Sequence, residues 1–296
     1  MRTSDTILIT GASGRVGVQL TVALRRRGWR IRSFVHRGAV AMADERVVGA
    51  LGDVNSLRRA MEGVTAVVHL AAVTHARRAA RYAEVNVVGT RNVVEAAIAE
   101  GVGRFIFVST RAIDRRGGAY SRSKADAEDI VRSSGLTYTI VRFPELYGTG
   151  GSEGLDRIVS LARAGAKVPV MGRGEDLVCP MYIDDAIDAC IGALERDVAD
   201  GKTYTLAGDC ISTRTFAEEA IRAFSSSSSI IGIPPAAVSA ATFLARFAPL
   251  PIYPDQLARL RARKPHPTAG AEHELRFSCR DLSQGLRALA DKQGSG

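Results

Sequence analysis

The stretch TGASGRVG, residues 10–17, joins a short apolar run to a helical pattern and decides the fold expected for this chain. Before it, residues 6–9 (TILI) are apolar and largely β-branched, as in a buried strand. After it, apolar residues recur at helical spacing as far as Gly28, which stands where a glycine ends a helix. A strand, a glycine-rich turn and a helix in this order place unpaired backbone N–H groups and the positive end of a helix dipole at one point. The stretch therefore predicts a binding site for a pyrophosphate.

The three glycines of this turn have separate expected roles. Gly11 allows the tight bend, Gly14 lets phosphates approach the backbone, and Gly17 lets the helix pack close to the strand. The alternative is an ordinary loop between a strand and a helix. The cofactor-binding residues predicted in the turn are Gly11, Ser13, Gly14, Arg15, Val16 and Gly17.

The composition describes a globular protein of moderate size. With 296 residues, 46% hydrophobic and 24% charged, the chain can form one large domain or two modest ones. The first five residues lead directly into the first expected strand without a signal-peptide pattern, which predicts a cytoplasmic protein. Four scattered cysteines show neither CxxC spacing nor a disulfide framework and are expected to be free thiols: Cys179, Cys190, Cys210 and Cys279.

The net charge of +9 would suit an anionic ligand, a nucleic acid or an acidic membrane surface. Part of the excess is arginine at an expected helix end, residues 25–27, where cations complement the helix dipole. Aromatic residues make up only 6%, without the basic interleaving that stacks on bases. We expect a small-molecule substrate, no nucleic acid and no transmembrane segment. We also expect no metal, because no cluster of His, Cys or carboxylates has ligand spacing.

The end of the second expected strand, residues 30–35, bears on the choice of cofactor. In dinucleotide-binding folds an acidic residue here accepts hydrogen bonds from the ribose 2′-hydroxyl. This chain has His36 and Arg37 instead, and together with Arg15 they would surround a 2′-phosphate. The pattern favours NADP over NAD, with solvated arginines as the alternative interpretation.

Buried strands alternate with amphipathic helices from residue 6 to about 142, which predicts an α/β fold with a Rossmann-like, doubly wound parallel sheet. Ligands bind such sheets at the carboxyl ends of the strands. Asp53 lies at one of these ends and is expected either to cap a helix or to contact adenine. His69, inside an apolar run, is expected to be a core histidine. Further cofactor contacts predicted near strand ends are Asp53, Val54, Leu70, Ala71, Ala72 and Val108.

Tyr120 and Lys124 are four residues apart and share one face of an expected helix. An ammonium near a phenol favours the phenolate and lowers the phenol pKa. A tyrosine with such a pKa can exchange a proton with a substrate hydroxyl or carbonyl. Thr110, at the end of the preceding strand, would hold the same oxygen. The alternative for this spacing alone is a pair on the protein surface.

With these residues in place, the sequence resembles the extended branch of the short-chain dehydrogenase/reductase superfamily, which comprises NAD(P)-dependent epimerases, dehydratases and reductases. The resemblance runs in order from residue 6 to about 200. The stretches that carry it are Gly11-x-x-Gly14-x-x-Gly17, Gly52-Asp53, His69 to Ala72, Asn86-x-x-Gly89-Thr90, Val108 to Thr110, Tyr120-x-x-Ser123-Lys124, Arg142-x-Pro144-x-x-Tyr147-Gly148 and Tyr182 to Asp185.

The resemblance implies roles for several residues. Tyr120 would be the catalytic acid/base, Lys124 would hold the nicotinamide ribose, and Thr110 would be their hydroxyl partner. Asn86 and the helix around it would support the site and a homodimer of paired helices. Other contacts implied are Asp53 near adenine and, beside the nicotinamide, Phe143 and Pro144.

Two departures bear on the substrate. Only nine residues separate Thr110 from Tyr120, fewer than in sugar-nucleotide epimerases. Residues 177–181 also lack the arginine that grips a substrate diphosphate in those enzymes. We therefore predict an NADP-dependent oxidoreductase that transfers hydride at a hydroxyl or carbonyl carbon of a sugar-like or hydrophobic substrate. The alternatives are a 4-epimerase or dehydratase of a nucleotide sugar or lipid-linked sugar with internally recycled NAD, and a catalytically silent nucleotide-binding subunit.

After residue 150 the alternating pattern ends. The predicted Rossmann domain covers residues 1–150 with returning segments at about 180–207, and a small substrate-binding lid domain covers 151–179 and 208–296. Asp184 and Asp185 are expected to be an N-cap pair. Residues 230–251 are nearly all apolar, and their expected helical portion, about residues 236–248, is too short for a membrane span. A core helix of the lid is expected there, with the wall of a lipid-like substrate site or a membrane contact as alternatives.

Overall fold

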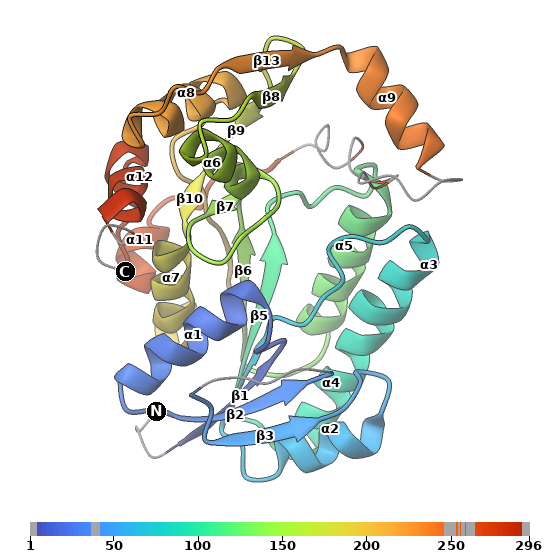
Figure 1. The fold of residues 1–296 in the computed structure, drawn as a ribbon. Helices are drawn as coiled ribbons and strands as arrows, with labels where there is room; N and C mark the ends of the chain where they lie inside the picture. The colour runs from blue at the N-terminus through green and yellow to red at the C-terminus, as the bar shows by residue number, and fades with distance from the viewer. Residues whose placement is uncertain are drawn as a thin grey trace. The chain divides into compact units, whose positions relative to one another are not determined.

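The computed structural model describes residues 5–36, 42–245 and 264–291, together with Tyr253, Asp255 and Ala258. The chain divides into two compact units (Figure 1). The first contains Met1–Arg142, Ile187–Thr205 and Asp255–Phe277, and the second contains Phe143–Ala186, Leu206–Pro254 and Ser278–Gly296. That the second unit binds substrate remains a prediction.

The first unit is built on a seven-stranded parallel sheet, which confirms the Rossmann-like fold class. Its strand order is β11-β6-β5-β4-β1-β2-β3. The strands are β1 (Thr6–Thr10), β2 (Arg30–Val35), β3 (Glu45–Val48), β4 (Ala66–His69), β5 (Arg104–Thr110), β6 (Tyr138–Phe143) and β11 (Thr203–Thr205). β3 was not predicted, because this short strand at the sheet edge has no fully buried residue and no apolar run to reveal it.

Helices cover both faces of this sheet, with α1 and α7 on one face and α4 and α5 on the other (Figure 1). The main helices are α1 (Arg15–Arg26), α2 (Val54–Met61), α4 (Gly89–Ala99), α5 (Gly118–Arg132) and α7 (Ile183–Glu195). Apolar side chains of α2, α4 and α5 form one buried core with those of the sheet, including Leu57, Val93, Val131 and Phe105. Shorter elements are α3 (Ala79–Tyr82), the 3₁₀ helix Asp197–Ala199 and α11 (Ala271–Leu275).

The helix expected from Tyr82 to Glu100 is interrupted in its hydrogen-bond pattern. Residues Ala83–Val88 form a π-helical segment between α3 and α4. Such segments are rare and are often found at functional sites. This one contains Asn86, whose side chain is buried.

The second unit combines helices with three short strand pairs. Its helices are α6 (Leu155–Arg163), α8 (Thr213–Ala223), α9 (Pro235–Leu244) and α12 (Leu282–Asp291). The pairs are β7 (Leu146–Tyr147) with β10 (Met181–Tyr182), β9 (Leu177–Val178) with β12 (Ile211–Ser212), and β8 (Val168–Met171) with β13 (Ile230–Ile233). Tyr147, Phe216 and Leu286 are fully buried in its core.

The expectation that all four cysteines are free thiols is wrong for two of them. Cys179 and Cys210 form a disulfide with their Cα atoms 4.0 Å apart, whereas Cys190 and Cys279 are free. Antiparallel pairing places Val178 opposite Ile211, and the cysteines are the next residues along the two strands. The sequence spacing of 31 residues gave no sign of this neighbourhood, because the strand pairing creates it.

The N-cap interpretation of Asp184 and Asp185 is also wrong. Both lie inside the first turn of α7, which begins at Ile183. Asp185 is 1% exposed, and its Oδ2 accepts a hydrogen bond of 2.9 Å from the backbone N–H of Arg280. The Arg280 guanidinium also lies 3.2 Å from Oδ1, so this carboxylate anchors the chain before α12.

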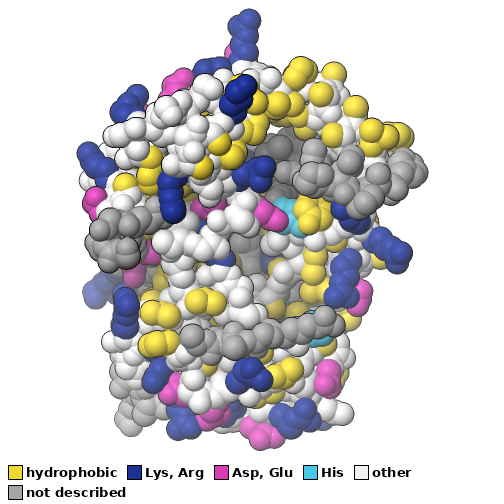
Figure 2. Space-filling view, viewed as in Figure 1, with side chains coloured by type: hydrophobic (Ala, Val, Ile, Leu, Met, Phe, Trp, Pro, Cys, Tyr) yellow, Lys and Arg dark blue, Asp and Glu magenta, His cyan; other side chains and the backbone are white. Residues whose placement is uncertain are grey.

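The core helix expected in the apolar region after residue 230 is a surface helix. Only Thr242 is buried within α9, while Phe243 is 56% and Leu244 52% exposed. Figure 2 shows hydrophobic side chains gathered on the surface over this helix. A helix that is apolar all round is ordinarily buried, so this exposure is unusual. Among the described residues, none of the helices combines the length and the hydrophobicity that a membrane span requires.

Candidate functional site

Two glycines of the turn between β1 and α1, Gly11 and Gly17, lie where the surrounding backbone leaves no room for a side chain. Gly11 has φ of 72°, and a Cβ added to it would lie 2.7 Å from the backbone nitrogen of Ala71. A Cβ on Gly17 would lie 2.3 Å from the Gly11 carbonyl oxygen. The turn is therefore held against α1 on one side and against the chain after β4 on the other.

The N-terminus of α1 has the features of an anion site. Its N-cap is Gly14, which supplies no side-chain hydrogen bond, and the first turn holds no acidic residue. Ser13 is exposed, and Arg15 and Val16 are half-buried in the first turn. The pyrophosphate of a dinucleotide fits such a helix end, because the backbone N–H groups and the dipole both favour negative charge.

Of the two residues after β2 that are predicted to select the cofactor, His36 and Arg37, the structure describes only His36. His36 is exposed directly after β2, as expected for a group that meets an adenosine ribose. Arg37 lies outside the described residues. The preference for NADP therefore stays a prediction.

Asp53 caps α2, which confirms one of its two expected roles. Its Oδ1 accepts hydrogen bonds of 3.1 Å from the backbone N–H groups of Asn55 and Ser56. The hydrogen bond from Ser56 holds the pKa of this exposed carboxyl below its ordinary value. Val54, the first residue of α2, is 45% exposed. Contacts of either residue with adenine stay predictions.

His69 is a core histidine, as predicted, and it links three elements. Its Nδ1 lies 2.6 Å from Thr10 Oγ1, and its Nε2 lies 3.0 Å from Thr90 Oγ1. Because the Thr90 hydroxyl donates to the Asn86 carbonyl, its oxygen accepts from Nε2–H, and Nδ1 then accepts from Thr10. Burial lowers the pKa of His69 to about 3, so the ring is neutral. The histidine ties the ends of β1 and β4 to the helix that contains Thr90.

Asn86 supports the loop after β4. Its Oδ1 accepts 2.8 Å from Val73 N–H, and its Nδ2 donates 3.0 Å to the Val73 carbonyl and 3.0 Å to Ser123 Oγ. Both ends of this amide therefore have protein partners. The half-buried residues just before Val73 are those predicted to lie along the cofactor: Leu70, Ala71 and Ala72.

The predicted catalytic residues lie where β5 ends and α5 begins. Thr110 is the last residue of β5, and its Oγ1 accepts 3.1 Å from Ala112 N–H. A hydroxyl that accepts one bond still carries a donor, as holding a substrate oxygen requires. Tyr120 is 7% exposed in the first turns of α5, and its ring meets that of Tyr82 edge-on at 5.9 Å.

Lys124 lies one turn after Tyr120 and is 3% exposed. Its Nζ donates 2.9 Å to the carbonyl of Val108 and stands 4.1 Å from the ring centre of Phe107, both in β5. Burial lowers the pKa of Lys124 to about 7, although the charge of Glu128 opposes this effect. Lys124 is thus fixed against β5, as a residue that positions a cofactor ribose needs to be.

The N-terminus of α5 is capped from a distant part of the first unit. Asp255 accepts hydrogen bonds from the backbone N–H groups of Ala119 at 2.6 Å and Tyr120 at 3.2 Å. A Cβ on Gly118, which has φ of 95°, would lie 2.2 Å from the same carboxylate. Nothing in the sequence signals this cap, since 135 residues separate Asp255 from Tyr120.

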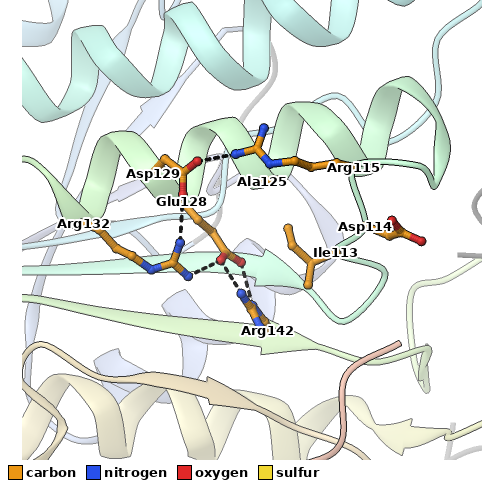
Figure 3. A pocket seen from close by; sticks show the side chains of 8 residues that line it. All are labelled: Ile113, Asp114, Arg115, Ala125, Glu128, Asp129, Arg132 and Arg142. Atoms are coloured by element: carbon orange, nitrogen blue, oxygen red, sulfur yellow. Dashed lines mark hydrogen bonds and ion pairs between the residues drawn. The ribbon is translucent and has the colours of Figure 1, made fainter. Parts of the chain in front are cut away.

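One turn beyond Lys124, the fully buried carboxylate of Glu128 is held by two arginines (Figure 3). Arg142 of β6 donates to it twice, at 2.8 Å from Nε and 2.6 Å from Nη2, and Arg132 donates from the next turn of α5. Burial raises the pKa of Glu128, but the hydrogen bonds and charge of Arg142, together with Ser109 and the charge of Arg132, outweigh burial and hold it below its ordinary value. These side chains line a cavity of about 230 Å³.

Phe143 and Pro144 begin the second unit and are buried and half-buried, respectively. Their place beside a nicotinamide stays a prediction. Among the residues that the structure describes, no three His, Cys, Asp or Glu side chains gather as metal ligands would.

Comparison with known proteins identifies the family. A ceramide reductase of Caulobacter vibrioides is 36% identical over 186 residues, which are 61% of this chain and 58% of the relative. A UDP-glucose 4-epimerase of Vibrio cholerae is 26% identical over 72% of this chain and 74% of the relative. In fold, the chain is similar to the UDP-glucose 4-epimerase of Thermotoga maritima solved with UDP-glucose, with a TM-score of 0.79, 20% identity and coverage of 98% and 99% of the two chains.

The chain spans only 52% to 58% of the length of three curated relatives that it matches. The model of the NAD dependent epimerase/dehydratase family matches residues 7–207, which is more than half of the chain. The chain therefore belongs to the NAD dependent epimerase/dehydratase family, and with it to the extended short-chain dehydrogenase/reductase superfamily.

Proposed function

We propose that this protein is an NADP-dependent oxidoreductase that reduces a carbonyl group, or oxidises the corresponding hydroxyl, on a hydrophobic substrate. The observation that carries the proposal is the fixing of Lys124 against β5, beside the strand end that bears Thr110 and one turn from Tyr120. A subunit that only binds nucleotides would have no use for this arrangement.

In the proposed reaction, the residues of the first unit bind, orient and exchange one proton. The α1 N-terminus and its turn would hold the cofactor pyrophosphate, because the first turn offers N–H donors without a capping side chain and holds no acidic residue. A bound nicotinamide supplies or accepts the hydride at the substrate carbon. Thr110 would donate a hydrogen bond to the substrate oxygen, and Tyr120 would exchange a proton with it. The Lys124 ammonium would favour the phenolate form of Tyr120.

Three observations support a hydrophobic substrate. The relative from Caulobacter vibrioides is named a ceramide reductase, which acts on a lipid by its name. The apolar helix α9 exposes Phe243 and Leu244 in the second unit, and residues 177–181 hold no arginine for a diphosphate. A 4-epimerase or dehydratase that recycles bound NAD is the second candidate, favoured by the match to an epimerase over 72% of the chain.

Analysis of the nucleotide in the purified protein tests the proposal. We would denature the protein, identify any released nucleotide, and then titrate nucleotide-free protein with NADPH and with NADH. A reductase that exchanges its cofactor should bind NADPH more tightly than NADH. Tightly retained NAD would instead support the epimerase or dehydratase, and binding of neither nucleotide would refute both.

A further inference from the structure

We propose that Glu128 is a positioning residue that acts through Lys124: its buried carboxylate, clamped by Arg142, holds the Lys124 side chain as an ammonium. The charged cluster around Glu128 has no role in the proposed reaction as described above, and the importance of Glu128 for turnover rests on the proposed function.

Glu128 is buried on the same face of α5 as Lys124. Tyr120, Lys124 and Glu128 follow one another at intervals of four residues, so they lie along one face of α5. Glu128 is 0% exposed and Lys124 is 3% exposed, so water screens their interaction only weakly. Figure 3 shows Arg132 and Arg142 pointing at the Glu128 carboxylate from α5 and β6.

The other groups named here near Lys124 do not supply the negative charge that Glu128 provides. Val108 offers a neutral carbonyl and Phe107 a ring face from β5. From β4, His69 is buried and neutral, since burial lowers its pKa to about 3. On α5 itself, the Tyr120 phenol is neutral until it gives up its proton. Glu128 is thus the carboxylate whose charge opposes the effect of burial on Lys124.

Replacement of the carboxylate would change the charge state of Lys124 in a defined direction. Glu128→Gln removes the negative charge and leaves the Arg142 cation without the carboxylate to which it donates, while Arg132 keeps its ion pair with Asp129. Both changes disfavour a second cation nearby, so they lower the pKa of Lys124. We expect a shift of about one pH unit or more. From a starting value of about 7, this would leave Lys124 mostly neutral at pH 7.

The test can observe Lys124 directly, because the chain contains only five lysines: Lys124, Lys167, Lys202, Lys264 and Lys292. Protein with ¹³C-labelled lysine would be titrated by NMR, and Lys124→Arg would identify the resonance. In Glu128→Gln the Lys124 midpoint should fall by about one pH unit or more. If the enzyme is active as proposed, the basic limb of the pH profile of kcat/KM should fall with it.

Two variants control for charge and for structure. Asp129→Asn removes a carboxylate from the next residue of the same helix, where the side chain is 55% exposed, and should leave the midpoint in place. Glu128→Asp keeps the buried charge and should stay near the wild-type midpoint. If Glu128→Gln does not fold, the double variant with Arg142→Gln replaces the ion pair by two amides and should still lower the midpoint, by less than Glu128→Gln because the Arg142 charge is also gone.

An unchanged Lys124 midpoint in the folded Glu128→Gln protein, or in that double variant, would overturn the inference. A lower midpoint in a protein that shows no turnover with any substrate would support the inference while the proposed function fails. The NMR titration therefore separates the two failures.

Discussion

Gly17→Ala should disrupt the dinucleotide site without touching any proposed catalytic group. In an ordinary helix, replacing glycine by alanine is favourable by about 0.5–1 kcal/mol. Here the new Cβ would lie 2.3 Å from the Gly11 carbonyl oxygen and 2.7 Å from the Cα of Ala12, whereas ordinary contacts begin at 3.4 Å. Both neighbours are backbone atoms, so the turn would have to move by about 1 Å.

We expect this movement to cost about 1–3 kcal/mol of unfolding free energy, the usual penalty for overpacking. It also displaces the N–H groups at the start of α1, so NADPH should bind at least about tenfold more weakly, which is about 1.4 kcal/mol. Unfolding in urea and calorimetric titration with NADPH would measure the two effects. The weaker binding should be visible at NADPH concentrations near the dissociation constant of the wild-type protein.

Gly52→Ala provides the matched control. A Cβ on Gly52 would have no neighbour within 4 Å, and this residue has no positive φ. Its stability and NADPH affinity should stay within about 0.5 kcal/mol of the wild type. If Gly17→Ala matched Gly52→Ala in both measurements, the close packing of the turn would have no part in binding, and the argument for a glycine-lined pyrophosphate site would be refuted.

Three further predictions concern the proton donor, the core histidine and the disulfide. Tyr120→Phe should reduce kcat by several orders of magnitude and leave the NADPH dissociation constant unchanged, and near-normal turnover would remove Tyr120 from the reaction. Because the pKa of His69 is about 3 in the folded protein and about 6.5 when unfolded, the unfolded state takes up the proton first on acidification. The unfolding free energy should therefore fall as the pH drops from about 6.5 to 5, with a slope that approaches about 1.4 kcal/mol per pH unit and that urea titrations of His69→Gln should lack. Reduction of the Cys179–Cys210 bond, which closes a loop of 31 residues, should lower the unfolding free energy by about 3–4 kcal/mol. Dithiothreitol should have no such effect on Cys210→Ala, and an equal effect on both proteins would argue against the disulfide.

Local sequence alone determined the Rossmann-like sheet and the glycine turn. A strand, a glycine-rich turn and a helix form from neighbouring residues, so the alternation of apolar runs with helical periodicity predicts them without knowledge of distant contacts. The same holds for Tyr120 and Lys124, whose spacing places them on one face of α5 in any helix. The core role of His69 also followed from its position inside an apolar strand.

Only the tertiary structure decided how these pieces are held. Asp255 caps α5 across 135 residues, Cys179 meets Cys210 through strand pairing, and Arg142 reaches Glu128 from a neighbouring strand. Each contact depends on which strands and loops become neighbours in space, and sequence periodicity carries no information on that choice. The exposure of α9 has the same origin: apolar composition predicts a preference for burial, but the packing of the whole unit decides whether a partner surface exists.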